Sequence, residues 1–241
     1  MLFTSYPGVF GIEHIIYMIL VVILFALSFI LIKKFIKTDK QKKLLIKIGA
    51  GVLLAWIITN RISVTYYDVV INHRENYTWL NIIPNSWCGI SSLILSLALL
   101  FGKKDNPVLH CISYIGALGG FLTIIYPDFL DSQMFFEIRS ITGLLHHTMN
   151  LWLVIVSIMC QYLVPSIKKW YYYPLGLSLI LSFGVFEKDA LGFTKAMQIN
   201  EPLLKSLPIL TSWYVVGSVS IILQILVLLT FEHFRKNKSS N

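Results

Sequence analysis

Residues 10–43 read FGIEHIIYMILVVILFALSFILIKKFIKTDKQKK, a long apolar stretch followed by a cluster of lysines. The apolar part, 10–32, is close to the ~20 residues that an α-helix needs to cross about 30 Å of hydrocarbon. Six more apolar stretches follow it, so we predict spans at about residues 10–32, 45–66, 82–101, 109–126, 141–164, 171–188 and 211–231. The expected fold class is all-α: a polytopic membrane protein with a seven-transmembrane-helix bundle that forms one integral membrane domain over residues 1–241.

The lysines and arginines lie mostly on alternate connections between these spans. One set of connections, with the C-terminal tail, carries Lys33, Lys34, Lys37, Lys40, Lys42, Lys43, Lys47, Lys103, Lys104, Lys168, Lys169, Arg235, Lys236 and Lys238. The other set carries Arg74, Arg139, Lys188, Lys195 and Lys205. By the positive-inside rule, the N-terminus is expected outside and the C-terminus in the cytoplasm. The net charge of +8 is therefore interpreted as a topology signal rather than as a nucleic-acid-binding face.

The composition, 56% hydrophobic and 13% charged, excludes an ordinary soluble domain. The first span has no leading positive charge and no small-x-small cleavage site, so it is expected to be a retained anchor.

Three widely spaced cysteines in apolar stretches predict neither a disulfide framework nor a zinc site. The absence of an internal repeat lowers the odds of an inverted-repeat transporter. An Ile-, Lys- and Asn-rich composition predicts a bacterial plasma membrane, and no cofactor or metal is expected.

Polar residues gather in the predicted outer half of five spans. Cys88 lies about six residues, roughly 9 Å, below the outer end of its helix. The other members of this group are Glu13, His14, Asn60, Arg61, His146, His147 and Glu187. Because polar groups are costly at membrane depth, each of them is a candidate for function.

The spacing on two helices suggests a catalytic set. Cys88 and Ser92 are four residues apart in the span at 82–101, in a stripe of small residues suited to close helix contact, where Ser92 is expected only to pack. His146 and Asn150 are four apart in the span at 141–164. Asn150 is also three residues from His147, so it could orient either imidazole, while the two histidines are expected to point about 100° apart. A cysteine beside an oriented histidine is the smallest set of side chains that supports nucleophilic acyl chemistry. We therefore predict Cys88, His146, His147 and Asn150 as catalytic residues.

A second group of residues is predicted to bind substrate: Asn60, Arg61, His14, Arg139 and Glu187. Arg61 would lower the pKa of the thiol or bind a phosphate in a bidentate manner.

Each candidate also has a structural interpretation. Cys88 could be a packing residue, and the histidines could be satisfied groups near helix ends. Arg61 could pair with an acidic residue, either Glu13, Asp68 or Glu187, and thereby hold helices together.

Three stretches resemble a known family. The sequence IPNSWC at residues 83–88 resembles the LPLHLC element that opens the third helix of the YwaF-like integral membrane proteins, which are related to the animal transmembrane protein 164 family. Arg139 followed by His146 and His147 is similar to the helical histidine of that family. The sequence NEPLL at 200–204, before Trp213, is similar to its Pro-containing approach to the last helix.

The resemblance implies a compact seven-helix bundle. It also implies an acyltransferase that moves fatty acyl groups between phospholipids, with Cys88 as nucleophile and His146 or His147 as base. One departure stands out, because Asn85 or Ser86 replaces the histidine of the LPLHLC element. Bacterial members need not share the animal activity, since a fold does not fix a function.

Three functions remain open from the sequence. The first is a cofactor-free lipid acyltransferase or lipid hydrolase that works in the outer leaflet. The second is a non-enzymatic transporter or sensor that binds a small anionic ligand or lipid headgroup, and the third is a structural subunit. All three have membrane lipids as partners and none involves nucleic acid, while the oligomeric state is left open.

Overall fold

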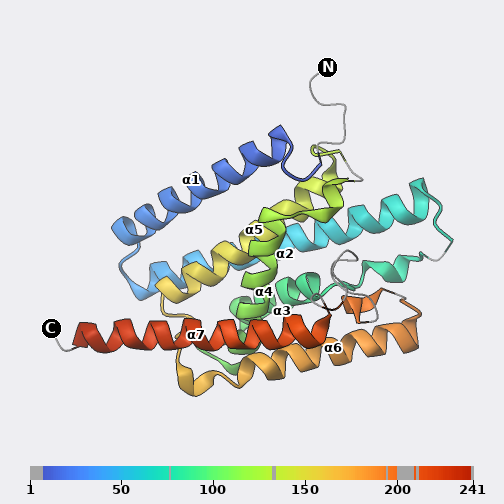
Figure 1. The fold of residues 1–241 in the computed structure, drawn as a ribbon. Coiled ribbons are helices and arrows are strands. Elements are labelled where there is room, and N and C mark those ends of the chain that lie inside the picture. The colour runs from blue at the N-terminus through green and yellow to red at the C-terminus, as the bar shows by residue number, and fades with distance from the viewer. Residues whose placement is uncertain are drawn as a thin grey trace.

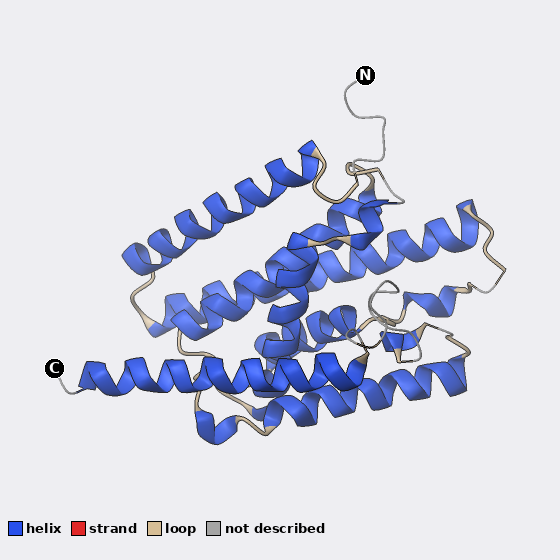
Figure 2. Cartoon of the chain, in the orientation of Figure 1, coloured by secondary structure: helices blue, strands red, loops and turns tan. Residues whose placement is uncertain are grey.

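The computed structural model describes residues 8–75, 77–131, 134–193, 195–199, 209 and 212–239. Within these residues the chain forms seven α-helices and no strand. Figures 1 and 2 show how these helices are arranged. The helices are α1 (Ile12–Phe35), α2 (Asp39–Tyr66), α3 (Trp87–Phe101), α4 (Pro107–Ile125), α5 (Ile138–Met159), α6 (Tyr172–Leu191) and α7 (Trp213–Ser239). The predicted all-α bundle of seven helices is confirmed for the described part of the chain.

Two predicted spans are too long where capping and turn residues end the helix. The span at 82–101 starts as a helix only at Trp87, because Pro84 favours extended backbone before it and the Ser86 side chain caps α3 by accepting from Gly89 N–H. The span at 141–164 stops at Met159, two residues before Gln161 takes a left-handed φ of 60°. In contrast, α2 begins before its predicted span, because Thr38 and Gln41 form a capping box at its start.

Five helical segments are long and apolar enough to cross a membrane: α1, α2 with its π-helical extension to Ile71, α4, α5 and α7. Helix α3 is apolar but has only 15 residues. Helix α6 has 20 residues but is not among the five. Both pack against α4.

The centre of the bundle is a ring of four helices. Helix α5 packs on α2 and α4, and α3 packs on the same two helices from the opposite side. Fully buried leucine and isoleucine side chains fill the interior between them, namely Leu53, Leu95, Leu99, Ile115 and Leu153. Helix α6 packs on α4, whereas α1 and α7 contact the bundle through few residues and expose much of their apolar surface (Figure 1).

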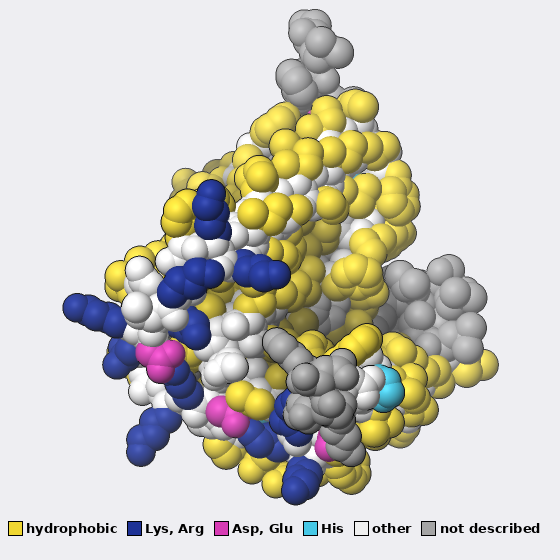
Figure 3. Space-filling model, turned by 90° about the vertical axis from the view of Figure 1, so that its left-hand side faces the viewer, with side chains coloured by type: hydrophobic (Ala, Val, Ile, Leu, Met, Phe, Trp, Pro, Cys, Tyr) yellow, Lys and Arg dark blue, Asp and Glu magenta, His cyan; other side chains and the backbone are white. Residues whose placement is uncertain are grey.

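One end of the molecule carries most of the basic residues. The last turn of α1 holds Lys33 and Lys34, and the connection before α6 holds Lys168 and Lys169. Figure 3 looks at this end and shows lysine and arginine side chains gathered on it. We call it the lysine-rich end; that it faces the cytoplasm stays a prediction.

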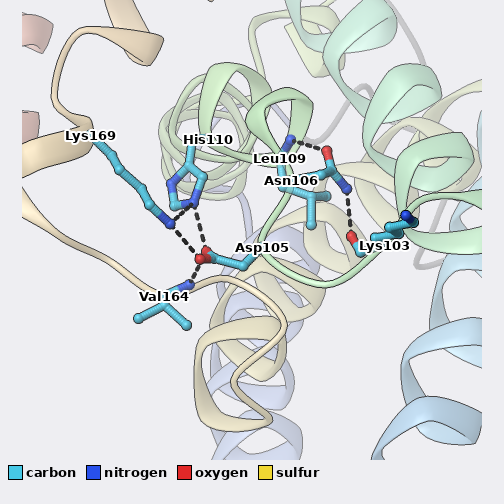
Figure 4. Close-up of polar contacts among 7 residues, drawn as sticks. All are labelled: Lys103, Asp105, Asn106, Leu109, His110, Val164 and Lys169. Atoms are coloured by element: carbon cyan, nitrogen blue, oxygen red, sulfur yellow. Dashed lines mark hydrogen bonds and ion pairs between the residues drawn. The ribbon is translucent and has the colours of Figure 1, made fainter.

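An ionic cluster joins two connections at the lysine-rich end (Figure 4). The Asp105 carboxylate accepts hydrogen bonds from the Lys169 ammonium, from His110 Nε2 at 2.7 Å and from the Val164 N–H at 2.9 Å. Partial burial raises the pKa of Asp105, but the bonds from Lys169, Val164 and His110 outweigh it and hold that pKa below its ordinary value. The cluster therefore ties the α3–α4 connection to the segment between α5 and α6.

Candidate functional site

A hydrogen bond fixes α3 against α5 across the ring. Asn150 Nδ2 donates to Ser92 Oγ at 2.5 Å, and both side chains are buried. The Asn150 amide also lies against Gly116 of α4, where a β-carbon would come within 2.5 Å of Asn150 Oδ1. Close packing of the three helices at this level therefore requires glycine at position 116.

The next level, one turn closer to the N-termini of α3 and α5, holds the thiol and the imidazoles. Cys88 precedes Ser92 by four residues and His146 precedes Asn150 by four, so each lies directly above the residue that makes the bond. Helices α3 and α5 both run antiparallel to α4, because both end where α4 begins: α3 ends just before Asp105, and Asp105 bonds to Tyr162 and Val164, which follow α5. The shared direction brings Cys88 and His146 to the same height in the bundle.

Glycines of α4 form the wall of this level. A β-carbon at Gly119 would lie 2.6 Å from Cys88 Sγ and 2.9 Å from the Trp87 ring. A β-carbon at Gly120 would lie 2.6 Å from the carbonyl oxygen of His147. The thiol on α3 and the backbone of His147 on α5 thus approach neighbouring positions on one face of α4, which we call the glycine face (Gly116, Gly119 and Gly120).

His146 is held in a defined tautomer. Its Nδ1 lies 3.1 Å from the Thr142 carbonyl oxygen, which can only accept, so Nδ1 carries the proton. Its Nε2 is buried and has no hydrogen-bond partner among the described residues. The His146 and His147 rings lie side by side, with centroids 4.0 Å apart and planes at 36°.

Asn60 and Arg139 lie one further turn toward the N-terminus of α5. Asn60 Nδ2 donates to the Arg139 carbonyl and to Thr142 Oγ1, each at 3.1 Å. The Arg139 guanidinium bonds both carboxylate oxygens of Glu137, at 2.9 and 2.8 Å, and lies 4.3 Å from the centre of the Tyr67 ring. These contacts attach α2 to the first turn of α5.

Arg61 holds the turn that leads into α3. Its guanidinium donates to the carbonyls of Asn81, Ile82 at 3.5 Å and Ile83 at 3.2 Å. It also interacts electrostatically with Glu187, whose fully buried carboxylate accepts no hydrogen bond from the described residues. Arg61 therefore acts on the site through the position of the chain before Cys88.

His14 docks α1 onto α4 and uses both ring nitrogens. Nδ1 accepts from the Phe10 N–H at 3.1 Å, and Nε2 donates to the Ile124 carbonyl at 2.8 Å. The structure thus places Cys88, the backbone of His147 and the Asn150 amide against neighbouring glycines of α4, and it joins Asn150 to Ser92. It places His14 near the C-terminal end of α4 in a structural contact.

Several residues of the site were not among the predicted ones. Ser92 was expected only to pack, and the three glycines of the glycine face were not considered. A spacing of small residues at 116 and 120 is typical of close helix contact in membranes and could have indicated them. No sequence pattern indicated Met197, which is buried and has a φ of 49°. Its N–H donates to the Asn85 carbonyl before α3, and its carbonyl oxygen accepts a hydrogen bond from Trp213 Nε1.

The NEPLL sequence at 200–204 lies outside the described residues. Among the residues that are described, no group of three or more His, Cys, Asp or Glu could hold a metal ion.

Comparisons with known proteins identify a family. The TMEM164 family matches the chain over residues 9–231, which includes all residues of the site. No curated protein and no solved structure matches the chain.

Proposed function

The chain belongs to the TMEM164 family and is an integral, multi-pass membrane protein, and we propose that it transfers or hydrolyses acyl esters of membrane lipids through Cys88 and His146. The observation that supports this most is the state of His146. Its Nδ1–H is held by Thr142, so the lone pair on Nε2 is available as a base at the height of the Cys88 thiol. Covalent acyl chemistry needs a thiol and a base in a fixed tautomer, and the facing helices α3 and α5 supply one each.

The proposed reaction has two steps. His146 Nε2 takes the thiol proton while Cys88 Sγ attacks the ester carbonyl, and a tetrahedral adduct forms. The carbon–oxygen bond of the ester then breaks, the imidazolium returns the proton to the departing lysolipid alcohol, and a thioester remains on Cys88. In the second step His146 takes a proton from a second lipid alcohol or from water while this oxygen attacks the thioester carbonyl. The carbon–sulfur bond then breaks, and the imidazolium returns the proton to the Cys88 thiolate.

The surroundings of the site support a lipid substrate. The thiol lies in the first turn of α3, near the end of the bundle opposite the lysine-rich end. Phospholipid ester carbonyls occupy the boundary between headgroups and hydrocarbon, and the N-terminal end of α3 faces that boundary on the side of the membrane opposite the lysine-rich end. The Cys88 side chain is half-buried, so it is accessible without being in open water.

The alternative of an anion-binding transporter or sensor depended on Arg61 as the main cation. In the structure its guanidinium donates to three backbone carbonyls. The geometry therefore favours the acyl enzyme over the anion binder.

The proposal is tested by the intact mass of the purified protein with its native lipid, before and after neutral hydroxylamine. We expect a fatty-acyl mass that hydroxylamine removes and that Cys88→Ala lacks. Cys111→Ala and Cys160→Ala are matched controls, because both thiols are buried elsewhere in the bundle, and they should keep the adduct. Release of fatty acid or transfer between phospholipids in nanodiscs should be lost in Cys88→Ala and in His146→Gln. Normal turnover by Cys88→Ala would disprove the proposal.

A further inference from the structure

A groove lies at the lysine-rich end of α3, at the opposite end of that helix from Cys88. It has a volume of about 500 Å³. Ile94, Leu97 and Ala98 of α3 with Val108 of α4 form its wall, and Lys103 and Asn106 lie at its rim. The groove therefore combines an apolar wall with a polar, basic rim.

The length of α3 places this rim near the edge of the hydrocarbon. Fifteen residues of helix span roughly 22 Å, which is less than the ~30 Å of a bilayer core. Phe101, the last residue of α3, is 82% exposed, as expected for a side chain that contacts lipid. A lysine that follows such a short helix lies at the depth of lipid headgroups rather than in open water.

Lys103 differs from its basic neighbours in its charge environment. Lys104 is 3.6 Å from the Asp39 carboxylate, and the Lys169 ammonium is bound to Asp105. No ion pair of Lys103 occurs among the described residues, and Figure 4 shows it on the other side of Asn106 from the Asp105 cluster. The groove thus carries an unneutralised positive charge at its rim.

The turn that presents Lys103 is firmly built. Asn106 Nδ2 donates to the Lys103 carbonyl at 2.6 Å, and Asn106 Oδ1 accepts from the Leu109 N–H at 3.1 Å (Figure 4). Gly102 allows the chain to leave α3 sharply, since a β-carbon there would lie 2.3 Å from the Ala98 carbonyl oxygen. Pro107 begins α4 directly after this turn, so the positive end of the α4 dipole adds to the charge of Lys103.

We infer that this groove binds an anionic phospholipid of the leaflet at the lysine-rich end. One acyl chain lies along Ile94, Leu97 and Ala98, and the phosphate pairs with the Lys103 ammonium. Selection for an anionic lipid follows from the rim, because the nearest carboxylates, Asp39 and Asp105, are already paired with other lysines. The site would hold a structural or regulatory lipid and does not depend on the chemistry proposed for Cys88.

The test is native mass spectrometry of the full-length protein titrated with phosphatidylglycerol or with phosphatidylcholine. The wild-type protein should bind phosphatidylglycerol in preference, and Lys103→Gln should weaken that binding roughly fivefold, the effect of about one lysine near a membrane surface. Lys168→Gln is the matched control: it removes an exposed lysine at the same end that is not part of the groove and should leave binding unchanged.

A second variant tests the groove rather than the charge. Ala98→Phe fills the apolar wall and should weaken binding of phosphatidylglycerol while Lys103 is kept. Equal loss in Lys103→Gln and Lys168→Gln would show attraction to the basic surface as a whole and would overturn the site. Unchanged binding in Lys103→Gln, or equal binding of the two lipids, would also overturn it. Acyl release by Cys88 should be measured in parallel, and its presence or absence does not affect the outcome.

Discussion

The Asn150 amide on α5 donates a hydrogen bond to the Ser92 hydroxyl on α3, and the two atoms are 2.5 Å apart. This bond sets the register of two helices that carry Cys88 and His146 one turn above it. The relationship makes Ser92 and Asn150 positioning residues for the proposed chemistry.

Asn150→Leu should lower the free energy of unfolding by about 1–3 kcal/mol, because the buried Ser92 hydroxyl loses its partner. Ser92→Ala should cost a similar amount, and the double variant should cost less than the sum, since both changes remove the same bond. Denaturant unfolding in detergent measures these values. Ser218→Ala is the control, because the exposed Ser218 hydroxyl bonds only to its own helix. Additive effects of Ser92→Ala and Asn150→Leu would contradict the coupling.

Gly119→Ala should reduce acyl transfer, because the new methyl group would lie 2.6 Å from Cys88 Sγ and 2.9 Å from the Trp87 ring. The thiol must move away from the height of His146, at a cost of about 1–3 kcal/mol in stability. Gly51→Ala in α2 is the matched control, since no atom lies within 4 Å of a β-carbon there. It should leave activity unchanged and raise stability by up to about 1 kcal/mol. The rate of alkylation of Cys88 by a small thiol reagent gives a readout that is independent of activity.

Arg61→Gln should loosen the turn before α3, because the guanidinium bonds to the carbonyls of Asn81, Ile82 and Ile83 are lost. We expect faster hydrogen exchange in residues 79–90 and slower acyl transfer. Arg74→Gln is the control: it breaks an ion pair of 3.2 Å with Asp68, but Arg74 itself is exposed. If Arg61→Gln abolished binding of inorganic phosphate while exchange stayed unchanged, the anion-binding function would be favoured instead.

Asp105→Asn should lower stability at neutral pH and should make stability less dependent on acid. The pKa of Asp105 is depressed by Lys169, Val164 and His110 against the effect of its burial. A carboxyl group whose pKa is lower in the folded state than in the unfolded state stabilises the fold at pH values above its unfolded-state pKa of ~4. This stabilisation is lost as the pH falls through the folded-state pKa. The gap in melting temperature between the wild-type protein and Asp105→Asn should therefore narrow below pH about 4.

Asp39→Asn is the control for this experiment, because Asp39 is 80% exposed and its ion pairs are long. Its gap in melting temperature should be small at every pH. A gap for Asp105→Asn that stays constant on acidification would contradict the assignment.

Much of the fold followed from local patterns in the sequence. Apolar length predicted seven helices and all their approximate positions, because a chain in hydrocarbon must satisfy its backbone groups within each segment. The ends of helices were less well predicted where a cap or turn decides them, as at Ser86 and Gln161. The alternate placement of lysines matched a molecule with one lysine-rich end.

The candidate site shows where sequence reasoning stops. Spacing of four residues placed Cys88 above Ser92 and His146 above Asn150 on their own helices. It did not show that Ser92 and Asn150 meet, nor that Asn150 bonds Ser92 rather than a histidine. Arg61 was predicted to bind a ligand, but its guanidinium donates to backbone carbonyls about twenty residues further along the chain.

The sequence by itself therefore determined which segments become helices and which side of each helix is polar, because helix geometry is a local property of the chain. The tertiary structure alone decided that α3 and α5 face each other along the glycine face of α4. This arrangement depends on side-chain volume. Only because Gly116, Gly119 and Gly120 lack β-carbons can the Asn150 amide, the Cys88 thiol and the His147 carbonyl approach α4 so closely. Contacts between residues so far apart in the chain result from the packing of three helices, and the periodicity of a single helix does not predict them.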